Sequence, residues 1–316
     1  MEREPANGSV GEPARGAVDV GTNTMRLLVV DEDGATITRE LRMVRLGEGV
    51  DANGHLADAA IERAMDAFTD FRDRWRNLGL FDKQVVLGAT SAVRDAVDRD
   101  RFLDRVRESA PGVDVRVLSG EEEADGAFRG VAASLPDATR PLVVMDPGGG
   151  STELVVGDVD DHVVGSVSMQ LGSVRLTERH MPSDPPSEAQ VLSAVSEVHG
   201  QVTRAVESLG LDVDDIGTLV GVAGTVTTLA ALAHELGPWQ DGAAHGRILT
   251  ATDVLLVSND LIVHDRATIA AHDEVQDGRE DVIAAGALIV RGVLDVLRVE
   301  ELVVSEADGL DGLVLP

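Results

Sequence analysis

The sequence has 316 residues, of which 43% are hydrophobic, and a formal net charge of −29 from 56 acidic and 27 basic residues. It contains no cysteine, which excludes disulfides, thiolate metal sites and cysteine nucleophiles. So acidic a surface disfavours nonspecific binding to nucleic acid, because that binding depends on basic side chains. No apolar run approaches the roughly 18 residues of a membrane-spanning helix, so we expect a cytoplasmic protein without a membrane partner.

The acidic residues are spread along the whole chain, and Lys83 is the only lysine. In multimolar salt the Debye length falls to about 3 Å, and the mutual repulsion of such a surface is screened. The composition therefore favours a halophilic source. The alternative is an ordinary acidic protein, which usually keeps more lysine.

The first half of the chain alternates between strand and helix after a polar tail over residues 1–15 that is predicted to be disordered. Alternation and turn residues predict strands over 16–21, 25–46 with a hairpin turn at Asp33-Gly34, 83–90 and 113–119. Apolar residues at steps of three and four predict helices over 58–78, 98–110 and 120–135, the last with Ser119 as its N-cap. This alternation indicates an α/β fold with a parallel component.

The second half repeats this order after a break at residues 135–141. Strands are predicted over 142–146, 152–157, 162–171, 218–223 and 301–305, and helices over 187–209 and between 224 and 298. We therefore expect two domains, over 16–135 and 136–300. A last segment over 301–316 is expected to return to the first domain or to lie beside it.

The two halves open on matching stretches, AVDVGTNTMRLLVVD from residue 17 and VVMDPGGGSTELVVG from residue 143. Both read as strand, D-x-G-x-x-[ST], strand, so that Asp19, Gly21 and Thr24 correspond to Asp146, Gly148 and Ser151. A repeat at this distance predicts two similar domains that face each other. A single glycine cluster is more simply explained as a hairpin turn, but two copies with matched acids favour a functional site.

Glycines in such a turn let backbone amides approach an anion, and the final hydroxyl adds a donor, so each turn predicts a phosphate site. Neither turn is a P-loop, because a strand and not a helix follows it. An acid before each turn suits Mg²⁺, which takes one or two carboxylates together with phosphate oxygens and water. Asp146 and Glu153 are the expected metal pair.

A third glycine turn, GVAGTVTTLAAL at 221–232, leads into a helix whose N-terminus could face another phosphate through Gly224 and Thr225. Close packing of a glycine against the helix explains this turn equally well. Trp75 and Trp239 are assigned to packing.

The order of these motifs resembles the superfamily of actin, sugar kinases and chaperones, whose duplicated, ribonuclease H-like domains close on phosphate and metal. Further stretches narrow the resemblance: GATSAVRDA at 88–96, SGEEEADGAFRGV at 119–131, LGSVRLTE at 171–178 and REDVIAAGALIV at 279–290. Together with DPGGGSTELVVG they resemble the family of exopolyphosphatases and guanosine pentaphosphate phosphohydrolases, in its short two-domain form. The resemblance runs from about residue 16 to 305.

The resemblance implies hydrolysis of terminal phosphoanhydride bonds in inorganic polyphosphate, with guanosine pentaphosphate as the alternative substrate and Mg²⁺ or Mn²⁺ as cofactor. It implies that Glu123 is the base that activates water, although composition alone favours an acidic first helical turn at Glu121 to Glu123. It also implies the remaining site residues. The substrate or phosphate ligands are Asn23, Thr24, Arg26, Arg94, Gly148, Gly149, Gly150, Ser151, Arg175, Gly224 and Thr225, and the metal ligands are Asp146, Glu153 and Asp19.

The chain departs from the family pattern at Pro147, which removes one amide donor, and at Ala307 and Leu310 near the C-terminus. These departures keep a sensor without turnover open as an alternative. A kinase of the same superfamily is another alternative, and it would form ADP only with an acceptor present. The sequence leaves a homodimer open.

Overall fold

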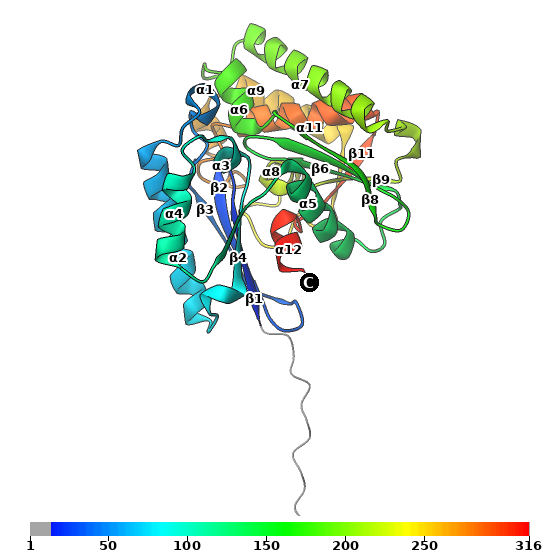
Figure 1. Cartoon of the computed structure of the whole chain (residues 1–316). Helices are drawn as coiled ribbons and strands as arrows, with labels where there is room; N and C mark the ends of the chain where they lie inside the picture. The colour runs from blue at the N-terminus through cyan, green and yellow to red at the C-terminus, as the bar shows by residue number, and fades with distance from the viewer. Residues whose placement is uncertain (1–13, 316) are drawn as a thin grey trace, which may run out of the picture.

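The computed structural model describes residues 14–315, and within them the strands form two mixed sheets flanked by helices (Figure 1). The α/β fold predicted from the sequence is therefore confirmed. The predicted tail lies outside the described residues except for its last two, and Arg15 already begins the first strand. No helix among the described residues is long and apolar enough to cross a membrane.

The first sheet has the order β3-β2-β1-β4-β5. The pairs β1/β2 and β2/β3 are antiparallel, while β1/β4 and β4/β5 are parallel. The bounds are β1 Arg15–Val20, β2 Thr24–Val30, β3 Thr36–Met43, β4 Val85–Ala89 and β5 Asp114–Val117.

The second sheet has the order β10-β11-β9-β6-β7-β8. The chain β8-β7-β6-β9-β11 repeats the first sheet, with two antiparallel pairs followed by two parallel pairs, and β10 adds an antiparallel edge strand. The bounds are β6 Leu142–Pro147, β7 Thr152–Gly157, β8 Val163–Met169, β9 Thr218–Gly221, β10 Ile248–Thr250 and β11 Glu301–Val304. The duplication predicted from the sequence is thus present in the topology.

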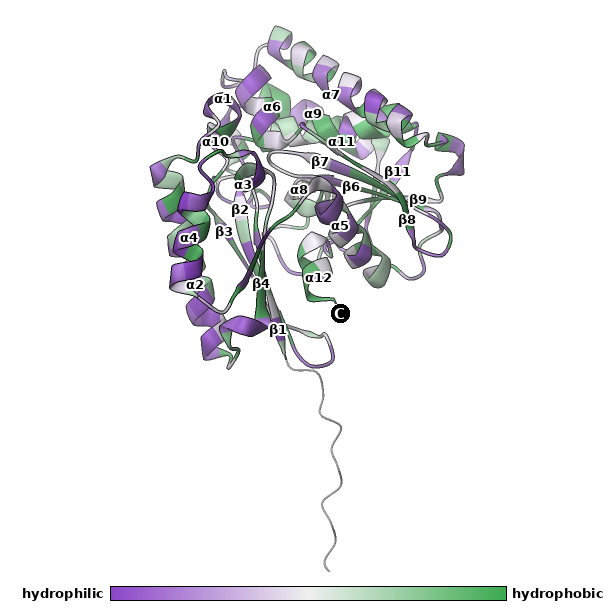
Figure 2. Ribbon diagram, in the orientation of Figure 1, coloured by the Kyte–Doolittle hydropathy of each residue, from purple (hydrophilic) through white to green (hydrophobic). Residues whose placement is uncertain are grey.

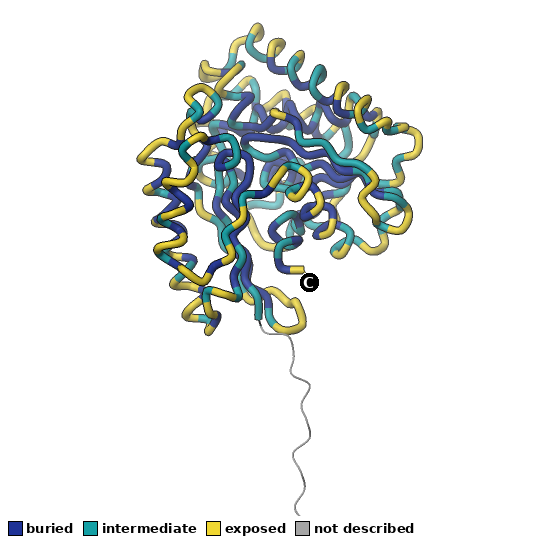
Figure 3. The backbone as a smooth tube through the Cα atoms, in the orientation of Figure 1, coloured by how far each residue is buried: buried dark blue, intermediate teal, exposed yellow. Residues whose placement is uncertain are grey.

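Helices cover the outer face of each sheet, with polar residues outward and apolar residues toward the strands (Figures 2 and 3). On the first sheet, Phe68, Phe71 and Trp75 of the periodic helix α2 are buried in one core with Phe102 of α4. On the second sheet, α7 and α11 pack together, with α7 against β8 and α11 against β6. The bounds are α1 Val50–Asn53, α2 Asp58–Asn77, α3 Ser91–Asp95, α4 Asp100–Ser109, α6 Ser173–His180, α7 Glu188–Leu209, α8 Ala223–His234, α9 Ala251–Val263, α10 Arg266–Ile269 and α11 Ile283–Leu297.

The last helix of each half packs on the sheet of the other half. Helix α5 (Gly120–Ser134) shares a core with β6, β7 and β9 of the second sheet, where Phe128 is buried. Helix α12 (Gly309–Val314) places Leu310 and Val314 in a core with β1 and β2 of the first sheet. The two helices also pack against each other (Figure 1). This exchange ties the two halves together.

The ranges predicted for the two domains stay a prediction, and the packing adds to them. Helix α5 follows the first sheet in the sequence but covers the second. Within the C-terminal segment, β11 extends the second sheet and α12 reaches the first. Helix α5 follows β5, and α12 follows β11. The residues at the start of both helices therefore lie at the junction of the two halves.

If α12 fastens the two halves together, removing its buried anchor should destabilise the whole chain. Leu310 is fully buried, so we expect Leu310→Ala to lower the free energy of unfolding by about 2–5 kcal/mol through lost burial and the cavity left behind. Urea denaturation measures this change. Leu192→Ala, at a side chain 63% exposed on α7, is the control and should change stability by less than about 0.5 kcal/mol. An equal effect of both substitutions would show that α12 is not such an anchor.

Candidate functional site

A cleft of about 770 Å³ lies where the two halves meet, and both predicted phosphate turns line it. Most residues predicted for the site are among its lining residues: Asp19, Asn23, Thr24, Arg26, Glu123, Asp146, Gly148, Gly149, Ser151, Gly224 and Thr225. Four others are not among them: Arg94, Gly150, Glu153 and Arg175. The structure therefore gathers residues from four separate motifs around one space.

The first phosphate turn joins β1 to β2 and is held from behind by the chain that follows β3. The carbonyl of Thr22 accepts a hydrogen bond from the Gly47 amide at 2.8 Å. The carbonyl of Asn23 accepts from the amides of both Val44 and Arg45 at 2.9 Å. The carbonyls are thereby turned away from the position that an anion would take.

The second turn, between β6 and β7, is held in the same way by the first turn of α6. The carbonyl of Gly148 accepts from the Ser173 amide at 2.9 Å, and that of Gly149 accepts from the Val174 amide at 2.9 Å. The Gly148 amide donates to the Asp146 carbonyl at 3.1 Å, so the amides of Gly149 and Gly150 are the candidate donors for an anion in this turn. Pro147 supplies no amide, so this turn has one donor fewer than its glycines would suggest.

The two turns touch each other at Gly150. A Cβ on Gly150 would lie 2.7 Å from both the Ser91 Oγ and the Thr22 Oγ1, two hydroxyls that are themselves hydrogen-bonded at 2.9 Å. Glycine at this position is therefore required for the close approach of the two halves. The predicted binding of phosphate by Gly150 stays a prediction, and this contact adds a packing requirement at the same position.

In each half, one residue of the second strand faces the acid of the motif, and the charge of that residue differs between the halves. The strand register places Asp19 opposite Arg26 in the first half, and Asp146 opposite Glu153 in the second. The first pair is a neutral ion pair, whereas the second is two carboxylates side by side. The two phosphate turns are therefore electrostatically different, although their backbones are alike.

Arg26 is held between two carboxylates. Its Nε and Nη2 donate to Asp19 Oδ2 at 3.0 and 2.6 Å, and its Nη1 donates to Asp308, which lies at the start of α12. Burial alone would raise the pKa of Asp308, but the charge and hydrogen bond of Arg26 outweigh it and hold that pKa below its usual value. Asp308 was not predicted, although its place after β11 corresponds to that of the acidic segment after β5.

Glu123 lies in the first turn of α5 and is mostly buried. Ser119 and Glu122 form a capping box at this helix start, as the N-cap prediction requires, and Glu122 is exposed. Burial and then the charge of Glu153 raise the pKa of Glu123 well above its usual value, against the lowering effect of Arg94. Arg94 Nη1 donates to Glu123 Oε2 at 2.8 Å and to the Leu118 carbonyl at 2.9 Å, so it orients the carboxylate.

Asp146 and Glu153 are two carboxyls buried side by side. Burial and neighbouring carboxylates raise the pKa of Asp146 to about 8 and that of Glu153 to about 7. Glu153 is 1% exposed behind the lining and accepts a hydrogen bond from Ser168 Oγ at 2.6 Å, whereas Asp146 faces the cleft. A hard divalent cation fits this set of oxygen donors, because its charge offsets their mutual repulsion.

Arg279 was not predicted as a site residue, although the stretch that contains it carried the resemblance. It lines the cleft beside Gly224, where a Cβ would lie 2.0 Å from the guanidinium Nη2. Its Nε donates to Gln276 Oε1 at 3.0 Å, and it forms no ion pair with any carboxylate among residues 14–315. Burial and then the charge of Arg26 lower its pKa to about 10, so it remains a cation at neutral pH.

Arg175 lies on the far side of the second turn, outside the cleft. Its Nε donates to the Gly150 carbonyl at 2.7 Å, and its Nη2 donates to Asp95 at 2.7 Å. Its Nη1 pairs with Asp51. All three partners compete with a substrate for this guanidinium. The structure thus places Arg175 as a tie between the halves.

The assignment of Trp239 to packing is wrong. Its side chain is 46% exposed and lines the cleft, whereas Trp75 is buried in the first core as expected. Trp239 lies in the turn-rich segment between α8 and β10, where no periodic pattern marks which residues face inward.

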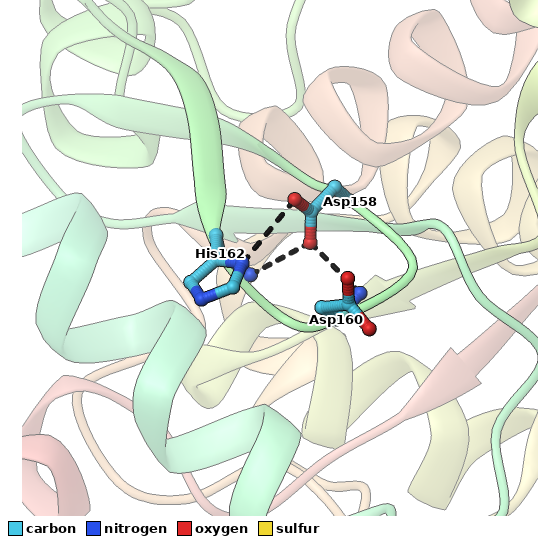
Figure 4. A group of neighbouring side chains, drawn as sticks. All are labelled: Asp158, Asp160 and His162. Atoms are coloured by element: carbon cyan, nitrogen blue, oxygen red, sulfur yellow. Dashed lines mark hydrogen bonds and ion pairs between the residues drawn. The ribbon is translucent and has the colours of Figure 1, made fainter.

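One group of three metal-type side chains lies apart from the cleft, at the turn between β7 and β8. Asp158, Asp160 and His162 have donor atoms within 4.8 Å of one another (Figure 4). Asp158 Oδ1 accepts from the amides of Asp160 and His162 at 2.8 and 2.9 Å, and this turn geometry accounts for the cluster. The cleft acids form no such group among the described residues.

Comparison with known proteins identifies relatives over almost the whole chain. Residues 28–315 match the model of the Ppx/GppA phosphatase family. The chain is 40% identical to "Exopolyphosphatase 2" of Mycobacterium tuberculosis, over 95% of this chain and 97% of that protein. It is 27% identical to "Guanosine-5'-triphosphate,3'-diphosphate pyrophosphatase" of Vibrio atlanticus, over 96% of this chain and 59% of that protein.

Solved structures agree with this match. An exopolyphosphatase from Cytophaga hutchinsonii superposes with a TM-score of 0.84 at 26% identity, over 95% of this chain and 96% of that one. The Ppx/GppA family member of Aquifex aeolicus superposes with a TM-score of 0.78 at 28% identity, over 96% of each chain. On its sequence, its fold and its cleft, the chain belongs to the Ppx/GppA phosphatase family.

Proposed function

We propose that this chain is an exopolyphosphatase that hydrolyses the terminal phosphoanhydride bond of inorganic polyphosphate. One observation carries the proposal: a mostly buried carboxylate, Glu123, lies in the same cleft as two amide-lined turns and the cation Arg279. Phosphoanhydride hydrolysis needs those parts, namely an oriented water, donors for the phosphate oxygens and positive charge. The name of the mycobacterial relative supports the choice of polyphosphate.

In the proposed reaction, a water held by Glu123 attacks the terminal phosphorus while the bond from that phosphorus to the bridging oxygen breaks. Glu123 accepts the proton of the water, and the chain leaves one phosphate shorter. The turn containing Gly148, Gly149 and Ser151 holds the phosphate oxygens, with Arg279 opposite. Arg94 keeps Glu123 in place. Mg²⁺ or Mn²⁺ held at Asp146, with Glu153 behind it and Asp19 across the cleft, would neutralise charge on the phosphate oxygens.

Removing the charge of Glu123 should remove turnover but not binding. We expect Glu123→Gln to lower kcat by about 10²- to 10⁴-fold, the usual contribution of a general base, while the affinity for polyphosphate stays within a few fold. Phosphate release and a binding titration measure the two quantities. Glu122→Gln, at the exposed neighbour that caps the helix, is the matched control and should keep kcat. Unchanged turnover in Glu123→Gln would remove Glu123 from the base role.

The raised pKa values of Asp146 and Glu153 predict how stability depends on pH. In the folded protein these carboxyls hold their protons up to about pH 8 and 7, whereas in the unfolded chain they release them near pH 4. Without a divalent cation, their contribution to stability is therefore full below about pH 4 and is lost as pH rises through 7 to 8. Mg²⁺ should raise the melting temperature more at about pH 8 than at about pH 6.

The double substitution Asp146→Asn with Glu153→Gln is the comparison for this experiment. It removes both titrations, so the fall of the melting temperature between about pH 6 and 8 should become shallower and the effect of Mg²⁺ should disappear. An effect of Mg²⁺ that persists in this variant would place the cation elsewhere.

The unpaired charge of Arg279 should contribute to substrate binding. We expect Arg279→Ala to lower kcat/KM for polyphosphate by about 10- to 100-fold, the range for a lost charge-assisted hydrogen bond. Gly224→Ala should reproduce much of this loss, because the added Cβ would occupy the place of the guanidinium. Arg291→Ala, at a partly exposed arginine of α11, is the control. If kcat/KM is unchanged in both test variants, Arg279 does not bind substrate.

Trp239 favours guanosine pentaphosphate as a second candidate substrate. Polyphosphate has no group that stacks on an indole, whereas stacking of a nucleobase contributes about 1–3 kcal/mol. The segment that carries Trp239 is fixed on both sides, by Glu274 at the Gly237 amide and by Glu306 at the Gly242 amide. Competition between the two substrates in one reaction decides which is preferred.

The cellular setting remains part of the proposal. We infer a cytoplasmic enzyme of a halophile from the uniform negative charge and the near absence of lysine. Activity that increases from low salt to multimolar KCl would support this inference, and maximal activity at low salt would contradict it.

A further inference from the structure

The loop that carries Arg279, residues 276–282, lies against the first half of the molecule. At Gly278, whose φ is +85°, a Cβ would lie 3.1 Å from Met43 Cε at the end of β3. Arg45, two residues beyond Met43, reaches the same loop: its Nη2 lies 3.1 Å from Asp281 Oδ2 and 3.7 Å from Glu280 Oε1. The residues on both sides of Arg279 are therefore in contact with the opposite half.

The backbone of Arg45 is fixed in an unusual conformation. Its φ of +48° lies in the left-handed region, which costs a residue with a side chain about 1–2 kcal/mol. The conformation brings the amides of Val44 and Arg45 onto one acceptor, the carbonyl of Asn23 in the first phosphate turn. Arg63 of α2 donates to the Val44 carbonyl at 2.9 Å and so holds the same bend. Strain of this kind persists where neighbouring contacts enforce it.

Asp281 depends on Arg45 for its contact with the first half. Its Oδ1 is buried and has no hydrogen-bond partner among the described residues, so the Arg45 contact is made by the other oxygen. Glu280 is also fixed inside the loop, where its Oε2 accepts from the Gly278 amide at 2.6 Å. A continuous path of contacts thus runs from Asn23 through Arg45 and Asp281 to Arg279.

We propose that Arg45 is a positioning residue that clasps the 276–282 loop to the first phosphate turn and thereby holds Arg279 in the cleft. Arg45 is not among the residues that line the cleft, so it acts through Arg279 and does not contact substrate. The clasp spans the two halves on the side of Arg279, as Arg175 does behind the second turn. Its effect on substrate binding rests on the proposed function, whereas its effect on the loop does not.

The first test uses the protein without substrate and the variant Arg45→Gly. Glycine adopts a φ of +48° without strain, so this variant removes the side chain and keeps the bend. Hydrogen exchange of the amides in residues 276–282, in the opposite half of the molecule, reports loop opening. We expect their exchange to accelerate about three- to fivefold, in keeping with a partly exposed ion pair. Unchanged exchange overturns the clasp.

Two further variants sharpen this measurement. Asp281→Asn keeps the shape of the partner and removes its charge, so it should accelerate exchange in the same loop even if Arg45→Gly folds poorly. Arg107→Ala breaks an exposed ion pair with Asp104 on α4, away from the cleft, and should leave the loop unchanged. Faster exchange of the loop in Arg107→Ala as well would show general destabilisation and overturn the specific role.

The second test measures KM and kcat for tripolyphosphate in wild type, Arg45→Gly, Arg279→Ala and the double variant. We expect Arg45→Gly to raise KM about three- to fivefold with little change in kcat. In the Arg279→Ala background the same substitution should have no further effect, because the group that it positions is gone. Additive effects overturn the proposal. If the wild-type protein hydrolyses no polyphosphate, the proposed function fails. The hydrogen exchange of residues 276–282 still shows whether Arg45 holds the loop.

Discussion

The concentration of buried carboxyls around one cleft is the constraint on which the rest of the structure depends. A buried charge without a partner is costly, so each acid needs a cation or a proton. Arg26 forms ion pairs with both Asp19 and Asp308, and Arg94 forms an ion pair with Glu123. Asp146 and Glu153 form no ion pair with an arginine among residues 14–315, and burial together with neighbouring carboxyls raises the pKa of both. A cation bound beside them would therefore relieve their mutual repulsion.

The exchange of terminal helices explains how residues from distant parts of the chain meet in this cleft. Helix α5 leaves the first sheet, covers the second and presents Glu123 at its start. Helix α12 makes the reverse crossing and presents Asp308 at its N-cap, against Arg26. Since each sheet carries the last helix of the other, separation of the halves would expose two apolar cores at once. Single side chains, such as Arg175 and Arg45, also join the two halves through ion pairs.

Local patterns in the sequence predicted most of the fold and part of the site. Period and turn residues predicted α2, α7 and the strands, and the paired D-x-G-x-x-[ST] motifs predicted the duplication, because these features depend on neighbours in the chain. The sequence did not reveal the contacts of Arg175, the position of Arg279 in the cleft or the exposure of Trp239. Nothing near Arg175 in the sequence indicates Asp51 and Asp95, and nothing near Arg279 shows that it lacks a carboxylate partner. Whether an arginine is held in an ion pair or is free to bind a substrate depends on carboxylates that are distant from it in the sequence.

The divergence of the repeat at a single strand position separates the two phosphate turns chemically. Where the first half has Arg26, the second has Glu153, and each lies opposite the acid that the motif repeats in the two halves. In the first half Arg26 offsets the charge of Asp19, and it shares its own charge with Asp308. In the second half Glu153 places a second carboxyl beside Asp146. One backbone arrangement, used twice, therefore presents an acid beside an arginine in one half and two adjacent carboxyls in the other.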